Sequence, residues 1–246
     1  MNRLSIAIGC LTILPFGPRG DVQEADLGGS MFWFPLVGLF IGCGLIGVQG
    51  MIAKALPPLA TSAFLLLAWV VMTGALHLDG VGDVADGLYG GRTPEARLRI
   101  MKDPHVGAMA VVALATLLLV KCSLVGSLAP NVTNRALLFA PCIGRYGMVL
   151  LGSTLPYARV EGGTAASFVK HSSTRTLVGA TAIALLAALL LFGPTGFAFF
   201  GLALIGSLAL RQLFLATLGG ITGDALGATC ELLETLMLAL IIAAAR

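Results

Sequence analysis

Long apolar runs alternate with short polar islands along the chain. The runs cover residues 31–53, 59–78, 106–128, 136–153, 177–192, 197–218 and 232–245. A membrane-spanning helix needs about 20 mostly apolar residues, so the pattern predicts about seven spans, within a range of about six to eight because two runs are short. Between the fifth and sixth runs, Gly193-Pro194-Thr195-Gly196 predicts a tight turn.

Composition supports a membrane protein. Of the 246 residues, 57% are hydrophobic and only 11% are charged, whereas a soluble domain has about 25% charged residues. We therefore predict an all-α, polytopic integral membrane helical bundle that forms a single membrane-embedded catalytic domain over residues 1–246 and is surrounded by membrane lipid. The net charge of +3, without a run of Lys or Arg, argues against nucleic acid as a partner.

The N-terminal segment, residues 1–16, carries Arg3 followed by an apolar run. The run is too short to span a membrane, and no small-x-small cleavage pattern follows it. We expect a retained short segment that is membrane-embedded or interfacial.

Basic residues are unevenly distributed among the segments between the runs. They gather in the N-terminal segment and after the second and fourth runs, as Arg3 and Arg19, then Arg92, Arg97, Arg99 and Lys102, then Arg159, Lys170 and Arg175. The positive-inside rule places these segments in the cytoplasm. Residues 219–231 then face the cytoplasm as well. The three acidic segments described next, residues 77–87, 92–107 and 219–231, are therefore expected on one membrane face.

The densest acidic island is HLDGVGDVADG at residues 77–87. On a helix, Asp79, Asp83 and Asp86 would share one face. Three carboxylates beside a span are costly without a counter-ion, which favours a bound cation over the alternative of a helix end with solvated acids. The interleaved glycines would let a phosphate or a second helix approach the backbone.

The second island covers residues 92–107. Thr93 and Pro94 predict the capped start of a short helix. Arg92 and Lys102 could hold phosphate oxygens, and Asp103 could be a metal ligand or a base. Ordinary topology signalling is the alternative explanation for the basic residues.

The third island covers residues 219–231. Gly219, Gly223 and Gly227 recur every four residues, a spacing that lets helices pack closely. Packing does not explain Asp224, or Glu231 seven residues later on the same face. These two acids are expected to complete a metal site.

Arg145 lies inside the fourth apolar run. A buried arginine in a membrane needs an anionic partner, which could be a substrate phosphate or, alternatively, one of the aspartates. Oxygen ligands without histidine or cysteine partners suit Mg²⁺ or Mn²⁺ rather than zinc. Acidic clusters with Arg and Lys at one membrane face indicate phosphoryl transfer.

Three segments together resemble the hallmark motifs of the cobalamin synthase (adenosylcobinamide-GDP ribazoletransferase) family. They are HLDGVGDVADG at 77–87, IMKDPHVGAMA at 100–110, and GGITGDALGA at 219–228 followed by Glu231. FPLVG at 34–38, Leu14-Pro15 and the loop at 157–159 are also similar, so the resemblance covers nearly the whole chain. It departs at Ala75, where the family has glycine, and at Gly82, where the family has alanine; neither change removes a carboxylate.

The resemblance implies a multi-pass enzyme of the bacterial cytoplasmic (inner) membrane with its active site on the cytoplasmic face. Such an enzyme joins adenosylcobinamide-GDP to α-ribazole, or to α-ribazole 5'-phosphate, with release of GMP. This is the late step of nucleotide loop assembly in adenosylcobalamin (vitamin B12), and it requires Mg²⁺. Which acceptor is used stays open, as does a homo-oligomer or an assembly with other cobalamin-pathway enzymes.

The family chemistry leads to an assignment of residues. We predict Asp79, Asp83, Asp86 and Asp224 as metal ligands, with Glu231 nearby. Asp103 is the first candidate for the base and Asp86 the second, with Lys102 also catalytic. The predicted substrate contacts are Lys102, Arg92, Arg145, Arg159 and His77.

Two other functions are compatible with a membrane protein that carries acidic islands. A phosphotransferase that uses CDP-alcohols would carry DG-x2-AR, but Asp79-Gly80 is followed by Val81-Gly82-Asp83-Val84 without Ala-Arg. An ion-coupled transporter would show repeat symmetry and acids near the bilayer midplane, and no repeat is visible.

Overall fold

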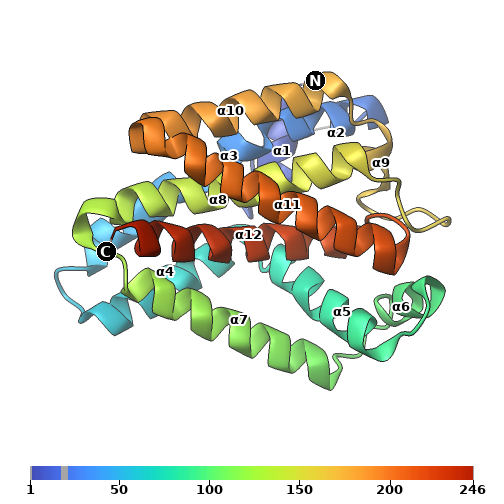
Figure 1. Cartoon of the computed structure of the whole chain (residues 1–246), viewed down its shortest axis with the longest axis horizontal. Helices are drawn as coiled ribbons and strands as arrows, with labels where there is room; N and C mark the ends of the chain where they lie inside the picture. Colours follow the sequence, from blue (N-terminus) through green and yellow to red (C-terminus); the bar gives the residue numbers. More distant parts are fainter. Residues whose placement is uncertain (1, 18–21, 246) are drawn as a thin grey trace.

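The protein is a bundle of helices, as the hydrophobic pattern predicts (Figure 1). The computed structural model describes residues 2–17 and 22–245, so Arg19 of the topology argument lies outside the described residues. The helices are α1 (Arg3–Leu11), α2 (Glu24–Ser30), η1 (Met31–Trp33), α3 (Phe34–Ile52), α4 (Pro58–Thr73), α5 (Leu76–Gly90), α6 (Pro94–Ile100), α7 (Ala108–Gly126), α8 (Pro130–Thr154), α9 (Ala166–Lys170), α10 (Thr174–Phe192), η2 (Gly193–Thr195), α11 (Gly196–Leu218) and α12 (Gly223–Ala244). Within the described ranges there is no strand, only an isolated parallel bridge between Tyr157 and Ile221.

The apolar helices are long enough to cross a membrane several times. Five segments qualify among the described residues, or six if the bent pair α4 and α5 forms one span. One segment, Thr174–Leu218, holds both α10 and α11, which pack against each other across η2, so the predicted turn at residues 193–196 is confirmed. The polytopic architecture is confirmed, and the count of about seven spans stays a prediction.

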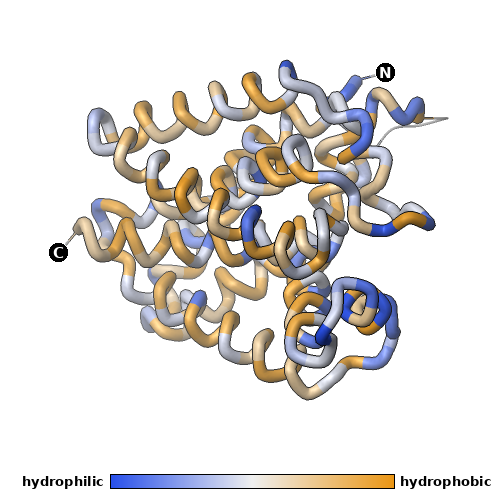
Figure 2. The backbone as a smooth tube through the Cα atoms, turned by 45° about the vertical axis from the view of Figure 1, so that its right-hand side comes forward, coloured by the Kyte–Doolittle hydropathy of each residue, from blue (hydrophilic) through white to orange (hydrophobic). Residues whose placement is uncertain are grey.

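Helix α8 forms the centre of the bundle. Its apolar window is 89% buried, compared with 22% for the peripheral α7, and α3, α10 and α12 all pack on it. Most of the helical backbone consists of hydrophobic residues, shown in orange in Figure 2. The N-terminal segment is the short helix α1, which buries Ile6, Ala7 and Leu11 and contacts α2 and α3.

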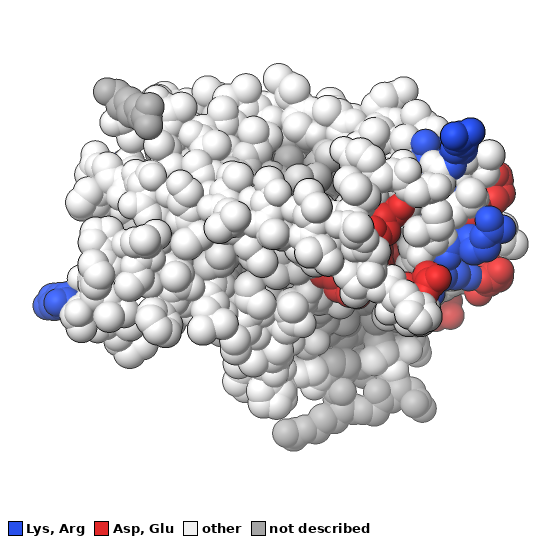
Figure 3. Space-filling view, turned by 90° about the horizontal axis from the view of Figure 1, so that it is seen from below, with Lys and Arg blue, Asp and Glu red and all other residues white. Residues whose placement is uncertain are grey.

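Most charged side chains visible in Figure 3 gather at one end of the bundle. This end holds α6, α9 and the junction between α11 and α12 (Figure 1). Arg97 donates to the carbonyl oxygen of Thr217 at 2.9 Å, and Arg159 pairs with Asp224 at 2.6 Å. Parts of the second and third islands therefore lie together at this end, whereas a shared membrane face for all three islands stays a prediction.

The second apolar run, residues 59–78, is broken rather than one continuous helix, and its role as a span stays a prediction. Helix α4 ends at Thr73, and α5 starts at Leu76 after a bend of 92°. Gly74 and Ala75 have φ values of 61° and 58°, and two left-handed residues in succession cannot continue a right-handed helix. The break turns α5, with its three aspartates, away from the axis of α4.

Replacing Ala75 with glycine should stabilise the protein by about 1 kcal/mol. A left-handed conformation costs a residue with a Cβ about 1–2 kcal/mol, and glycine removes most of that cost while adding some freedom to the unfolded chain. The thermal unfolding midpoint in detergent should rise. Ala63→Gly on the exposed side of α4 is the matched control and should lower the midpoint, since glycine inside a helix costs about 1 kcal/mol. A fall for Ala75→Gly as well would contradict the argument.

Candidate active site

Helices α5 and α12 approach so closely that Gly80 has no room for a side chain and Gly227 has very little. A Cβ on Gly80 would collide with the backbone of Asp224, and a Cβ on Gly227 would lie 3.1 Å from the Cα of His77. The expectation that a second helix approaches the first island is confirmed. The expected glycine repeat on one helix is wrong for Gly219, which ends α11 with a φ of 74°.

The close approach brings the acids of the first and third islands together. Asp83 lies within electrostatic range of Asp224, Asp79, Asp86 and Arg159. Asp79 and Asp224 both lie in the first turns of their helices, where the positive end of the helix dipole favours a carboxylate. The side chains of Asp79 and Asp83 form no hydrogen bond or ion pair with the residues that the structure describes. We call Asp79, Asp83, Asp86 and Asp224 the acidic cluster.

Asp86 is already engaged with the start of α7. Its carboxylate accepts hydrogen bonds from the backbone N–H groups of Gly107 at 2.7 Å and Ala110 at 2.9 Å. The side chain therefore caps α7 from a neighbouring helix and satisfies two otherwise unpaired donors. Its role as a metal ligand or base stays a prediction.

The loop at residues 155–163 contacts the acidic cluster through Arg159. Arg159 donates to Asp224 at 2.6 Å and lies 3.4 Å from the carbonyl oxygen of Met101. Lys102 forms an ion pair with Glu161. Two of the predicted phosphate contacts, Arg159 and Lys102, thus lie at the loop that borders the acidic cluster.

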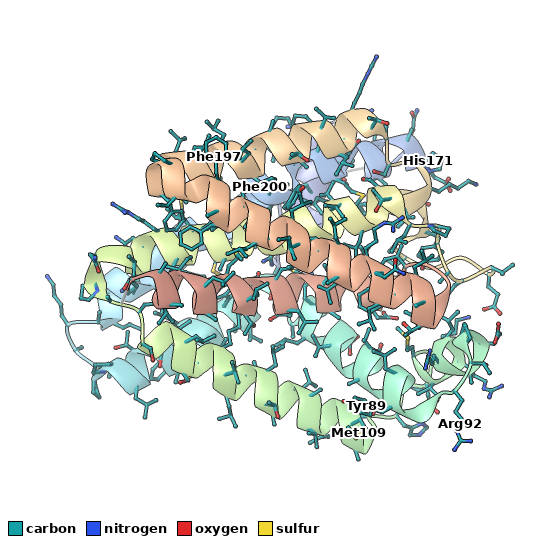
Figure 4. All side chains as sticks on the ribbon, in the orientation of Figure 1. Tyr89, Arg92, Met109, His171, Phe197 and Phe200 are labelled. Carbon is teal, nitrogen blue, oxygen red and sulfur yellow. The ribbon has the colours of Figure 1, made fainter. Side chains whose placement is uncertain are left out.

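Two other predicted site residues are exposed at the same end of the bundle. Asp103 accepts a hydrogen bond from the backbone N–H of His105 at 3.0 Å, and the ring Nδ1 lies 2.6 Å away. These contacts lower the pKa of Asp103, which makes its carboxylate a weaker base. Arg92 is exposed at the outer edge near Tyr89 (Figure 4). Neither Asp103 nor Arg92 bonds to the acidic cluster among the described side chains.

The short helix of the second island starts as predicted. Thr93 accepts a hydrogen bond from the backbone N–H of Ala96 at 3.3 Å, and Pro94 occupies the first turn of α6. The cap fixes the polar turn that leads to Lys102 and Asp103.

Three other predicted site residues belong to a second, deeply buried group. Lys121 on α7 pairs with Glu231 at 2.8 Å and with Glu234, both on α12. Arg145 on α8 pairs with Glu234, and its guanidinium lies 3.4 Å from Nδ1 of His77 on α5. We call these five residues the buried ion cluster. Arg145 therefore has an ionic partner, but the partner is a glutamate and not an aspartate, because α8 packs on the middle of α12.

The sequence pattern did not single out Lys121, and it indicated a structural role for Glu234. A lysine inside an apolar run, with Glu231 and Glu234 three residues apart on one helix face, is a usable signal, because charges within a membrane must pair. Lys121 and Arg145 carry two positive charges against the two negative charges of Glu231 and Glu234, so the buried ion cluster is balanced.

The acidic cluster suits a hard cation in its ligand type. Among the described residues, no three acidic, histidine or cysteine side chains converge closely enough to form a metal site made by protein alone. Mg²⁺ is usually held through only one or two carboxylates, with substrate phosphates and water completing its shell. Asp79 and Asp83 are the carboxylates available for this role, and the larger predicted set with Asp86, Asp224 and Glu231 stays a prediction.

Comparison with known protein families identifies the family of the chain. The family model described as Cobalamin-5-phosphate synthase matches residues 3–242. The chain belongs to this family. The resemblance of its three motifs is thereby confirmed.

Curated relatives of this family match the chain over almost its full length. One from Chlorobium phaeobacteroides is 37% identical over 241 residues and covers 96% of each chain. One from Desulforamulus reducens is 38% identical, covering 98% of this chain and 96% of its own, and one from Pseudomonas fluorescens (strain Pf-5) is 41% identical, covering 95% and 96%. All three are named adenosylcobinamide-GDP ribazoletransferase. No solved structure matches the chain.

Membership in the cobalamin-5-phosphate synthase family makes the protein a transferase of cobalamin biosynthesis. The match extends through all three acidic islands. It therefore favours this activity over a CDP-alcohol phosphotransferase or an ion-coupled transporter.

Proposed function

We propose that the protein is an adenosylcobinamide-GDP ribazoletransferase that uses Mg²⁺ and acts at the end of the bundle that holds the acidic cluster. The observation that carries the proposal is that Asp83 lies within electrostatic range of Asp79, Asp86, Asp224 and Arg159, in a chain whose family match covers residues 3–242. Unpartnered carboxylates next to a guanidinium suit a reaction between phosphate groups and a hydroxyl.

The proposed reaction breaks a phosphoanhydride bond and forms a phosphoester bond. A ribose hydroxyl of α-ribazole, or of α-ribazole 5'-phosphate, attacks the phosphorus that carries the cobinamide. The bond to the second phosphate breaks, GMP leaves with the electron pair, and the hydroxyl proton passes to a base. Asp103 and Asp86 remain the candidates for that base.

The residues of this chain contribute position and charge. Asp79 and Asp83 would hold Mg²⁺, which neutralises phosphate charge when bound. Arg159 lies 2.6 Å from Asp224, so its guanidinium is placed to contact phosphate oxygens next to the carboxylates. The buried contact of α5 with α12 holds the aspartates of α5 close to Asp224 of α12.

We place the enzyme in the bacterial cytoplasmic membrane with this end in the cytoplasm. The support is the gathering of charge at one end (Figure 3) together with the positive-inside rule. The cytoplasm is also where a nucleotide-activated donor would be available.

A GMP-release assay tests the function. Purified full-length protein in detergent receives adenosylcobinamide-GDP with α-ribazole or its 5'-phosphate, and GMP is quantified. Chelation of Mg²⁺ should reduce the rate by about 100-fold or more, and added Mg²⁺ should restore it. A CDP-alcohol donor serves as the negative control. Absence of GMP release with both acceptors would defeat the proposed function, and release that survives chelation would defeat the role of the metal.

A further inference from the structure

A cavity of about 590 Å³ lies between the start of α2, helix α9 and the loop at residues 155–163. Its lining includes Glu24, Tyr157, Arg159, Ala166 and Lys170. The volume falls within the range of about 300–1,000 Å³ that is typical of small-molecule sites. No acid of the acidic cluster lines it.

The polar lining favours an anion. The lining carries two cations, Arg159 and Lys170, and one acid, Glu24; Arg159 also pairs with Asp224 behind the lining. Glu24 lies 3.7 Å from the ring of His171, which directly follows α9 and is labelled in Figure 4. The Nε of Arg159 is buried and has no hydrogen-bond partner among the described residues. A buried donor without a partner is unfavourable, and a phosphate oxygen would satisfy it.

The remaining lining favours a flat ring. Tyr157 is half-buried in the cavity wall, and its aromatic face can stack with a heterocyclic base. Leu155 and Val169 add apolar surface beside it. A ligand that combines a phosphate with a flat ring matches both parts of the lining.

The cavity shares a wall with the acidic cluster. Arg159 lines the cavity and also pairs with Asp224. Tyr157 forms a backbone bridge to Ile221, three residues before that aspartate. A phosphate held by Arg159 in the cavity would therefore lie beside the carboxylates where the reaction is proposed.

We propose that this cavity binds a ribonucleoside 5'-monophosphate, with Arg159 and Lys170 holding the phosphate and Tyr157 stacking on the base. The inference rests on the proposed function, which supplies two such molecules: the departing GMP and the acceptor α-ribazole 5'-phosphate. The two share the chemistry that the cavity recognises, and separate binding measurements distinguish them.

The test measures binding of GMP, of α-ribazole 5'-phosphate and of inorganic phosphate to full-length protein in detergent by calorimetry. Lys170→Gln should weaken binding of one nucleotide by about tenfold. Arg175→Gln removes an exposed cation five residues away, outside the cavity lining, and should leave binding unchanged. Ala166→Trp should fill the cavity and eliminate binding. In turnover, Lys170→Gln should raise the KM of the acceptor, or weaken product inhibition by GMP, without changing kcat.

The nucleotide whose binding responds to Lys170→Gln is the occupant. The proposal is overturned if neither nucleotide binds, if Lys170→Gln and Ala166→Trp bind as the unmodified protein does, or if inorganic phosphate competes as well as the nucleotides. An unchanged thermal unfolding midpoint shows that the variants are folded. If GMP release is normal but nucleotide binding does not respond to Lys170→Gln or Ala166→Trp, this inference alone fails. If a nucleotide binds but no GMP is released, the proposed function fails.

Discussion

Asp83→Asn should reduce GMP release by about 100- to 1,000-fold while leaving the protein folded. Asp83 is the carboxylate on which the charges of Asp224, Asp79 and Asp86 all act, and it forms no hydrogen bond or ion pair with the described residues. Its negative charge therefore supports no described contact of the fold and is available to a cation. The measurement is the rate of GMP release at saturating Mg²⁺ and substrates.

The thermal unfolding midpoint separates this effect from a structural one. Asparagine has nearly the same shape as aspartate and relieves repulsion among the four carboxylates, so the midpoint in detergent should stay constant or rise. Glu95→Gln on the exposed face of α6 makes the same chemical change away from the acidic cluster and should leave turnover intact. Near-normal turnover of Asp83→Asn would show that the acidic cluster is not the reaction centre.

Glu234→Gln should destabilise the protein by about 3–5 kcal/mol, because breaking a buried ion pair leaves an uncompensated charge. The side chain is 0% exposed and pairs with both Lys121 and Arg145. Without its charge, two buried cations would share the single carboxylate of Glu231. The thermal unfolding midpoint in detergent should fall markedly.

A double-mutant cycle tests the charge balance of the buried ion cluster. Lys121→Met combined with Glu231→Gln removes one positive and one negative charge and leaves the Arg145–Glu234 pair intact. The double variant should lose less stability than the sum of the two single variants, since contacting residues are not additive. Additive losses would show that the charges do not act as a unit.

Much of the acidic cluster could be predicted from local spacing. Asp79, Asp83 and Asp86 share a helix face because a helix repeats every 3.6 residues, and α5 covers all three. The cap at Thr93 and the turn at residues 193–195 follow from equally local preferences. The bend after α4 could not be predicted, because Ala75 adopts a left-handed conformation that alanine seldom prefers.

The sequence by itself determined the class of the protein, the polar islands and the family to which its motifs belong, because hydropathy and residue spacing are properties of the local chain. Only the tertiary structure decided which charges meet. It placed Arg145 against Glu234 rather than an aspartate, gave Glu231 to Lys121, and set Arg159 between Asp224 and a cavity. Which charged side chains on different helices pair depends on the angle and depth at which those helices pack. Local spacing does not contain this information, because packing is fixed by the close approach of backbones that are distant in sequence, as at Gly80 and Asp224.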